Sequence, residues 1–212
     1  GFSTVTYKGT GATQYIGGTG FKPDLVWQKR RDGTDSHVLT DPIRGTDKSL
    51  YSDRTDAEAS PNPVSISALN SDGFTLGANG KTNGSGETVV AWNWDMGADT
   101  PTGFGAVTYK GNGGTQDLSL GFEPDLVWIK KRGASEYHVM FDTVRGLGDG
   151  KALYPNADKN EGLYPNGNVS KTNSDGFSIA TGSTGINYVN QSSQDYVAWG
   201  WDMGNTTASN TT

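Results

Sequence analysis

The chain has 212 residues, of which 31 are glycine, two are histidine and none is cysteine, and its formal net charge is −6. The acidic balance argues against nucleic acid and against an anionic membrane surface as partners, because both attract basic proteins. The lack of cysteine excludes disulfides, thiolate metal sites and a cysteine nucleophile, and no apolar run approaches the ~20 residues of a membrane-spanning helix.

Short strands separated by turns are predicted along the first half of the chain. Thr4–Tyr7 alternates in side-chain type, Leu25–Lys29 is apolar and rich in β-formers, and Thr88–Trp94 closes the half as a strand. Ser71–Phe74 is a turn that leads into a further strand. Thr55–Ala59 carries the one hint of a helix, a single turn.

The second half of the chain repeats the first. A period of about 102 residues is too long for a solenoid, whose units run about 20–50 residues, and it suits two similar domains in series. The strand predicted near the middle of the second half places Tyr137, Val139 and Phe141 on one face. The segments that return are Val5–Gly9 as Val107–Gly111, Phe21–Trp27 as Phe122–Trp128, Ser71–Phe74 as Ser174–Phe177, and Val90–Gly97 as Val197–Gly204.

The sequence therefore predicts an all-β protein made of two tandem β-sandwich domains with a jelly-roll-like architecture. We expect the domains at 1–97 and 103–204, a linker at 98–102, and a polar tail or linker at 205–212. Because the two halves begin and end at equivalent points, we expect them to be two units of a longer series. The cores are predicted to include four aromatic residues, Trp27, Phe74, Trp128 and Phe177.

Two aromatic features could stack against a sugar, although packing is the favoured interpretation of both. In Gly-Phe-x-Pro-Asp-Leu-Val-Trp, the proline forces an extended entry into a strand whose aromatic side chains we expect to be buried. Trp92 and Trp94 are two residues apart and share a strand face, as do Trp199 and Trp201. Such pairs favour a core or an interdomain contact over a sugar platform.

One polar triplet occurs in both halves, as His37, Asp41 and Arg44 and as His138, Asp142 and Arg145. A histidine and an aspartate four residues apart on a strand share a face, so a catalytic pair is an alternative. A catalytic triad also needs a nucleophile on a sharp turn, and Gly-x-Ser-x-Gly does not occur. We therefore interpret both triplets as structural hydrogen-bond networks in which the arginine clamps a carboxylate.

Aspartates recur at several equivalent positions, and a calcium site built from such loop carboxylates is an alternative. No EF-hand spacing is present, so we expect no bound metal and no cofactor. The chain also contains Asn-x-Ser/Thr triplets, among them those that begin at Asn83 and Asn190. In a chain rich in these residues we interpret them as chance matches.

The second half departs from the first over 145–174, which we predict to be a variable surface loop. The candidate glycan-binding residues are Tyr154, Tyr164 and Tyr188, which lie in segments rich in Asn, Gly and Ser. Exposed tyrosines beside adaptable polar groups suit weak, shape-based recognition. The favoured interpretation is nevertheless that these tyrosines pack under their own loops or against a neighbouring subunit.

Four motifs together resemble a β-rich domain common in marine bacteriophage proteins. They are Gly-Phe-x-Pro-Asp-Leu-Val-Trp, His-x-x-x-Asp-x-x-Arg-Gly, Ser-Asp-Gly-Phe and Val-Ala-Trp-x-Trp, and they cover nearly the whole chain. The resemblance implies a structural or adhesive role in tail fibres and other virion appendages, and it carries no chemistry.

We therefore expect a non-enzymatic, extracellular protein of a virion surface: a tail fibre, a knob or a capsid decoration that mediates assembly or host attachment. Its expected partners are other virion proteins and further copies of itself. One alternative is a carbohydrate-binding module that recognises host surface glycans, and a third is a glycan hydrolase. A bacterial surface array would have a similar composition.

Overall fold

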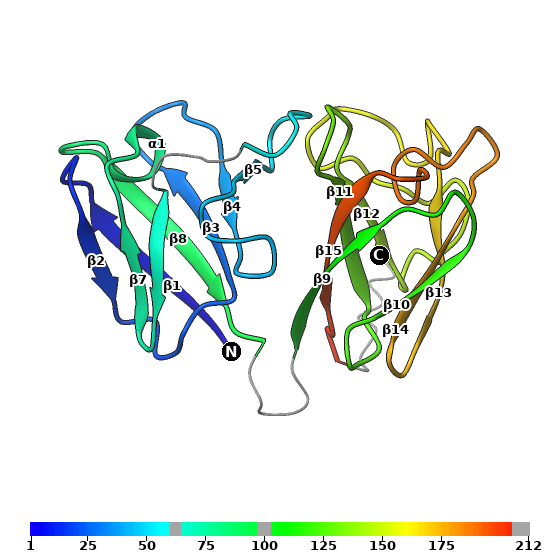
Figure 1. Ribbon diagram of the computed structural model, residues 1–212, viewed down its shortest axis with the longest axis horizontal. Coiled ribbons are helices and arrows are strands. Elements are labelled where there is room, and N and C mark those ends of the chain that lie inside the picture. Colours follow the sequence, from blue (N-terminus) through cyan, green and yellow to red (C-terminus); the bar gives the residue numbers. More distant parts are fainter. Residues whose placement is uncertain (60–64, 97–102, 205–212) are drawn as a thin grey trace, which may run out of the picture. The chain divides into compact units, whose positions relative to one another are not determined.

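Figure 1 shows the computed structural model of the chain, which describes residues 1–59, 65–96 and 103–204. The chain forms two compact units. Domain 1 consists of Gly1–Asp99 with Arg132–Glu136, and domain 2 consists of Thr100–Lys131 with Tyr137–Thr212. The predicted linker at 98–102 and the predicted tail at 205–212 lie outside the described residues.

Domain 1 contains two antiparallel sheets. Their strands and one short helix are β1 (Phe2–Lys8), β2 (Gln14–Gly17), β3 (Leu25–Arg30), β4 (Val38–Thr40), β5 (Leu50–Tyr51), β6 (Ile66–Asn70), β7 (Gly73–Leu76), α1 (Gly80–Asn83) and β8 (Thr88–Trp94). The larger sheet has the order β1-β8-β3-β4-β5 and the smaller one the order β2-β7-β6. The first strand therefore pairs with the last, and the second with β7, as in a jelly roll, whereas β3 pairs with β8 and β4.

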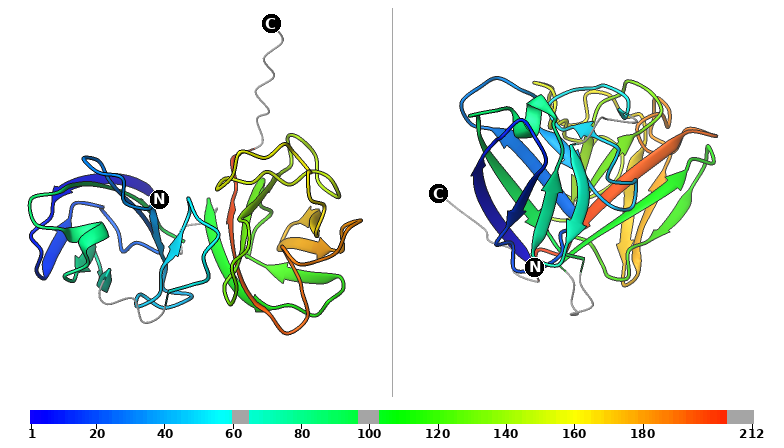
Figure 2. Two further views of the ribbon diagram at one scale, coloured as in Figure 1. Left: turned by 90° about the horizontal axis from the view of Figure 1, so that it is seen from above. Right: turned by 60° about the vertical axis from the view of Figure 1, so that its left-hand side comes forward.

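Domain 2 repeats the strand order of domain 1, except that its larger sheet has four strands where that of domain 1 has five. Its strands are β9 (Phe104–Lys110), β10 (Gln116–Ser119), β11 (Leu126–Lys131), β12 (Val139–Asp142), β13 (Asn168–Asn173), β14 (Gly176–Ala180) and β15 (Asp195–Trp201). Its sheets run β12-β11-β15-β9 and β10-β14-β13, which matches β4-β3-β8-β1 and β2-β7-β6 of domain 1. The predicted all-β fold of two tandem β-sandwiches is confirmed (Figures 1 and 2).

Each sandwich encloses one core between its two sheets. In domain 1, Val26 and Ala91 of the larger sheet pack with Phe74 of the smaller one. The equivalent residues of domain 2 are Val127, Ala198 and Phe177. The predicted core positions of Phe74 and Phe177 are confirmed.

Trp128 is buried as predicted, at 4% exposed, and Trp27 is half-buried, but neither belongs to the inter-sheet cluster of its domain. Their neighbours Val26 and Val127 face the opposite sheet. Because successive side chains of a strand point to opposite faces, each indole projects from the far side of the larger sheet.

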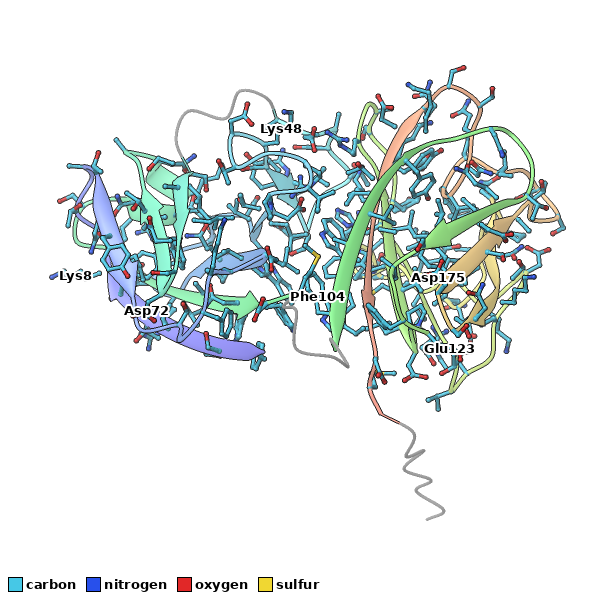
Figure 3. The ribbon with its side chains drawn as sticks, turned by 60° about the horizontal axis from the view of Figure 1, so that its bottom comes forward. Lys8, Lys48, Asp72, Phe104, Glu123 and Asp175 are labelled. Atoms are coloured by element: carbon cyan, nitrogen blue, oxygen red, sulfur yellow. The ribbon has the colours of Figure 1, made fainter. Side chains whose placement is uncertain are left out.

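The Ser-Asp-Gly-Phe turns are confirmed, and their glycines are explained by close backbone contact. A Cβ atom on Gly73 would lie 2.0 Å from the Ile16 carbonyl oxygen, and one on Gly176 would lie 2.0 Å from the Leu118 carbonyl oxygen. Asp72, labelled in Figure 3, accepts hydrogen bonds from the amides of Gly18 and Gly20 at 3.2 and 2.7 Å. The motif therefore joins β7 to the loop after β2.

The helical turn predicted at Thr55–Ala59 was wrong. Ala59 instead exchanges two backbone hydrogen bonds with Ser49, at 3.0 and 3.1 Å. So short a segment cannot nucleate a helix against such pairing. The helix of domain 1 is α1, whose first turn is capped by the Asn79 side chain accepting from the Lys81 amide at 2.8 Å.

Within the described ranges, no helix has the length and apolar character needed to cross a membrane.

Candidate functional site

The aspartate and arginine of each repeated triplet form an ion pair at the end of β4 or β12. Arg44 Nε donates to Asp41 Oδ2 at 2.7 Å, and the Arg44 amide donates to Asp41 Oδ1 at 2.9 Å. The remaining Arg44 nitrogens donate to the Leu39 carbonyl at 2.9 Å and to Glu58 at 3.1 Å. Both side chains of the Asp41–Arg44 pair are 0% exposed. The arginine thus ties the turn back to its own strand.

Asp142 and Arg145 repeat this geometry in domain 2. Arg145 Nε donates to Asp142 Oδ2 at 2.6 Å, and the Arg145 amide donates to Asp142 Oδ1 at 2.9 Å. Arg145 Nη1 reaches the Lys151 carbonyl at 3.0 Å and Glu161 at 3.1 Å. The side chains of Arg145 and Asp142 are 26% and 18% exposed, so this clamp is the wetter of the two.

The histidines of the two triplets are placed elsewhere. His138 Nδ1 accepts a hydrogen bond from Trp128 Nε1 at 2.9 Å, whereas Trp27 Nε1 donates to the Ser52 hydroxyl at 3.0 Å. Four residues of a strand span about 13 Å, so sharing a face does not bring the imidazole to the carboxylate. The predicted three-residue network is therefore divided into an Asp–Arg clamp and, in domain 2, a His–Trp pair.

The candidate glycan-binding tyrosines form an aromatic cluster with Tyr137. Tyr154 and Tyr188 are each only 4% exposed and belong to the core of domain 2, so these two pack under their own loops and are not exposed for glycan binding. The Tyr154 hydroxyl donates to the Tyr164 carbonyl at 2.9 Å and accepts from the Tyr164 amide at 3.0 Å. This exchange holds the variable loop against the sandwich and buries the ring beneath it.

Tyr164 is the member of the cluster that reaches the surface. It is 39% exposed, and its ring is nearly parallel to that of Tyr137, with the ring centroids 6.2 Å apart. A partly exposed, well-held ring of this kind can take an apolar face of a ligand.

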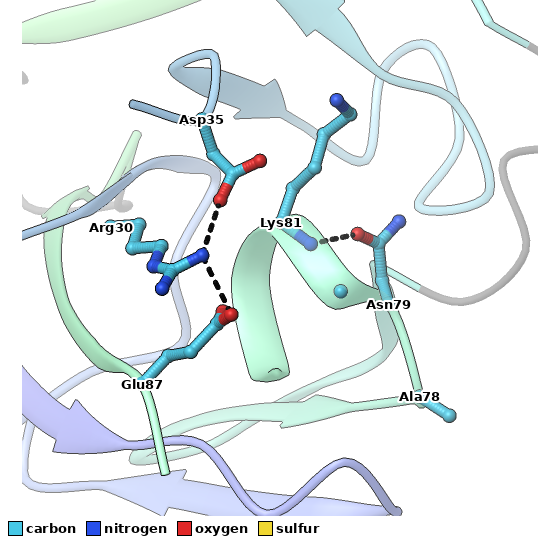
Figure 4. Close-up of a pocket in the computed structure, with 7 residues that line it drawn as sticks. Arg30, Asp35, Ala78, Asn79, Lys81 and Glu87 are labelled. Atoms are coloured by element: carbon cyan, nitrogen blue, oxygen red, sulfur yellow. Dashed lines mark hydrogen bonds and ion pairs between the residues drawn. The ribbon is translucent and has the colours of Figure 1, made fainter. Parts of the chain in front are cut away.

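Domain 1 carries a shallow, open hollow of about 540 Å³ between the end of β3 and α1 (Figure 4). We call it the polar hollow because most of its lining residues are charged or polar. Arg30 lies between the carboxylates of Asp35 and Glu87, at 3.0 and 2.7 Å. Arg30 Nε also donates to Asp32 at 2.8 Å. This arginine, together with the Thr88 amide, lowers the pKa of Asp32 to about 2. Asn79 and Lys81 of the α1 segment complete the opposite wall.

A family model matches the chain twice, over residues 1–103 and 100–212. Its description is "Domain of unknown function (DUF7483)". The chain belongs to this family. Comparison with curated proteins and with solved structures found no significant match. The two sandwiches are thus two DUF7483 domains in tandem.

A buried asparagine occurs at the same place in both DUF7483 domains. Asn83 Oδ1 accepts from the Thr10 amide at 2.9 Å, and its Nδ2 donates to the carbonyls of Ala12 and Gly77. Asn190 Oδ1 accepts from the Asn112 amide at 2.9 Å, and its Nδ2 donates to the Gly114 carbonyl. Sequence reasoning missed this role. The sequence feature that could have indicated it is the Asn-x-Ser triplet that begins at Asn83 in the first half and at Asn190 in the second.

Both DUF7483 domains also carry an aromatic cluster on the outer face of the larger sheet. In domain 1 the Trp27 ring lies 5.3 Å from Trp92 and 6.5 Å from Trp94. In domain 2 the corresponding distances from Trp128 to Trp199 and Trp201 are 5.5 and 6.4 Å. The predicted sharing of a face by each tryptophan pair is confirmed.

Within the part of the chain that the structure describes, no three His, Asp or Glu side chains lie close enough together to hold a metal ion. Several carboxylates instead bind the protein's own backbone groups. For example, Asp24 accepts from the Met96 amide at 2.9 Å, and Asp125 accepts from the Met203 amide at 3.0 Å.

Proposed function

We propose that this tandem pair of DUF7483 domains is a non-enzymatic structural module of a bacteriophage surface. In this proposal it forms part of a tail fibre, knob or capsid decoration and serves assembly or host attachment. Its partners are other virion proteins and further copies of itself. The resemblance of its motifs to β-rich domains of marine bacteriophage proteins supports the virion setting.

The proposal rests on the contacts of the repeated polar residues, which bind groups of their own domain. Asp41 and Arg44, like Asp142 and Arg145, are engaged with each other and with their own domain. The buried asparagines Asn83 and Asn190 hold loops in the same way. Side chains that are spent on holding the fold favour a scaffold, because a reactive group must be presented to a substrate. Variation between the copies falls in loops, where recognition usually sits.

Immunogold electron microscopy tests this proposal. An antibody raised against the whole chain is applied to particles purified from the culture that supplied the sequence, and host adsorption is measured with and without its Fab fragment. We expect gold at fixed positions on the particle surface. Labelling confined to host cells, with unlabelled particles, would overturn the proposal.

A second candidate function is recognition of host surface glycans, and the exposed ring of Tyr164 favours it. A glycan array probed with the whole chain and with Tyr164→Ala tests this site. Tyr15→Ala is the matched control, because Tyr15 is 54% exposed in domain 1. Binding lost in Tyr164→Ala and kept in Tyr15→Ala would support the site. Equal binding by both variants would place recognition elsewhere.

A further inference from the structure

The polar hollow of domain 1 is held in shape by Arg30. Its guanidinium is bound by Asp35 and Glu87 inside the hollow and by Asp32 beside it. The opposite wall is also braced, because the Asn79 side chain accepts from the Lys81 amide. The Lys81 ammonium lies 5.6 Å from the centre of the Tyr51 ring. Figure 4 shows Arg30 between Asp35 and Glu87, with Lys81 and Asn79 on the neighbouring α1 segment.

The segment of domain 2 that is equivalent to α1 lacks the polar residues that form the second wall of the hollow. The equivalence is fixed by matching hydrogen bonds: the Tyr7 hydroxyl donates to the Thr82 carbonyl at 2.7 Å, and the Tyr109 hydroxyl to the Val189 carbonyl at 2.6 Å. The preceding residue is Lys81 in domain 1 and Tyr188 in domain 2.

Asn79 of the hollow corresponds to Ile186 by the same alignment. The Asn83 amide donates to the Asn79 carbonyl at 2.8 Å, as the Asn190 amide donates to the Ile186 carbonyl at 2.9 Å. Ile186 and Tyr188 pack on the apolar core of domain 2. The two side chains that the α1 segment supplies to the hollow of domain 1 are therefore replaced in domain 2 by apolar residues of its core.

The chemistry of the lining suits a ligand with many hydroxyl groups. Carboxylates accept hydrogen bonds, an ammonium donates them, and an amide does both. Among the lining residues the two cations, Arg30 and Lys81, equal the two carboxylates, Asp35 and Glu87, which suits a neutral ligand. Concave sites with a few well-held polar groups are where small ligands usually bind.

We propose that this hollow in domain 1 is a binding site for a neutral saccharide. Asp35 accepts from sugar hydroxyls, Lys81 and Asn79 donate to ring and hydroxyl oxygens, and Glu87 holds Arg30 in place. The proposal rests on the glycan-recognition function put forward above, and it assigns that function to domain 1 in addition to the Tyr164 surface of domain 2.

Saturation-transfer NMR with the whole chain tests the proposal. The probes are free glucose, galactose, mannose and N-acetylglucosamine, each at millimolar concentration. We expect saturable transfer to at least one of them. Lys81→Tyr, which installs the residue found in domain 2, is expected to weaken that binding at least tenfold. Lys22→Tyr makes the same change at an exposed lysine outside the hollow and is expected to leave binding unchanged.

Asp35→Asn is the second variant, because it keeps the shape of the side chain and removes only its charge. We expect it to weaken binding as well. No transfer to any of the four sugars, or transfer unchanged in both Lys81→Tyr and Asp35→Asn, would overturn the proposal. The test uses no phage particles, so its failure is separate from a failure of the virion role, and the Tyr164 surface is tested by its own variant.

Discussion

Arg44 and Asp41, three residues apart, are joined twice: the Arg44 amide and its Nε each donate to one oxygen of the same carboxylate, at 2.9 and 2.7 Å. The pair Arg145 and Asp142 makes the same two bonds at 2.9 and 2.6 Å. The two copies differ in their exposure to solvent: the first pair is fully buried and the second is partly exposed.

This difference predicts unequal costs of breaking the clamp. Arg44→Ala leaves a buried carboxylate without its cation and is expected to destabilise domain 1 by about 3–5 kcal/mol. Arg145→Ala leaves a carboxylate that water can reach and is expected to cost domain 2 about 1–3 kcal/mol. Hydrogen exchange followed by mass spectrometry on the whole chain reports the two domains separately. Equal losses in the two domains would contradict this account.

A second prediction concerns alkaline pH. Burial raises the pKa of Tyr109 well above its ordinary value near 10, and it also raises the pKa of Tyr7. Because the folded-state pKa values are the higher ones, their contribution to stability is complete below about pH 10 and is lost as pH rises toward them. We expect some of the nine tyrosines to ionise only as the protein unfolds, which absorbance at 295 nm measures.

Tyr109→Phe provides the control for the alkaline titration. It removes the buried phenol and keeps the ring that stacks on Tyr196, whose centroid is 5.2 Å away. One late-ionising group is expected to disappear from the titration. If all nine tyrosines of the unchanged protein ionise reversibly near pH 10 while the fold persists, the burial argument fails.

The buried asparagines give a third prediction. Asn83→Ala and Asn190→Ala each leave backbone amide and carbonyl groups without partners, so each is expected to cost its own domain about 2–4 kcal/mol. Asn168→Ala is a useful comparison, since the Asn168 side chain has a single longer bond to the Thr181 carbonyl at 3.2 Å and a smaller loss is expected. Urea unfolding with domain-resolved hydrogen exchange measures all three. A larger loss for Asn168→Ala would count against the role of the shared pair.

A fourth prediction is a stabilising change. Gln28 is buried in domain 1 and donates to the Tyr7 hydroxyl at 2.8 Å, while its Oε1 is buried without a hydrogen-bond partner. Domain 2 has Ile129 at this position. Gln28→Ile is expected to stabilise domain 1 by about 1 kcal/mol, because it removes an unsatisfied acceptor and the Tyr7 hydroxyl keeps its bond to Thr82. A loss of stability in thermal unfolding would show that the Gln28–Tyr7 bond outweighs that cost.

The sequence was sufficient to predict the sandwiches because the repetition and the alternation of side chains are local signals. It could not decide which face of β3 was the core, since Val26 and Trp27 are both large and apolar. The histidines were misjudged for a similar reason. Alternation predicts which face of the strand a histidine and an aspartate share, but it does not predict whether the two side chains are close enough to bond. Tyr154 was misjudged because its burial depends on a loop that folds back through its own hydroxyl.

The equivalence of Asn83 and Asn190 was hidden by the insertion in the second half, which changes the offset between the copies along the chain. The polar hollow was hidden for a different reason. Arg30 and Asp35 are far from Lys81 and Glu87 in the sequence, and only the pairing of β3 with β8 and the position of α1 bring the two sets together.

The central claim, that the tandem DUF7483 domains belong to a phage particle, is tested most directly by quantitative mass spectrometry of gradient-purified particles from the source culture. The account predicts that peptides of this chain sediment with the particles, in a fixed ratio to the major capsid protein that persists through a second gradient. Peptides found in the soluble or cellular fractions and depleted from the particle band would contradict it.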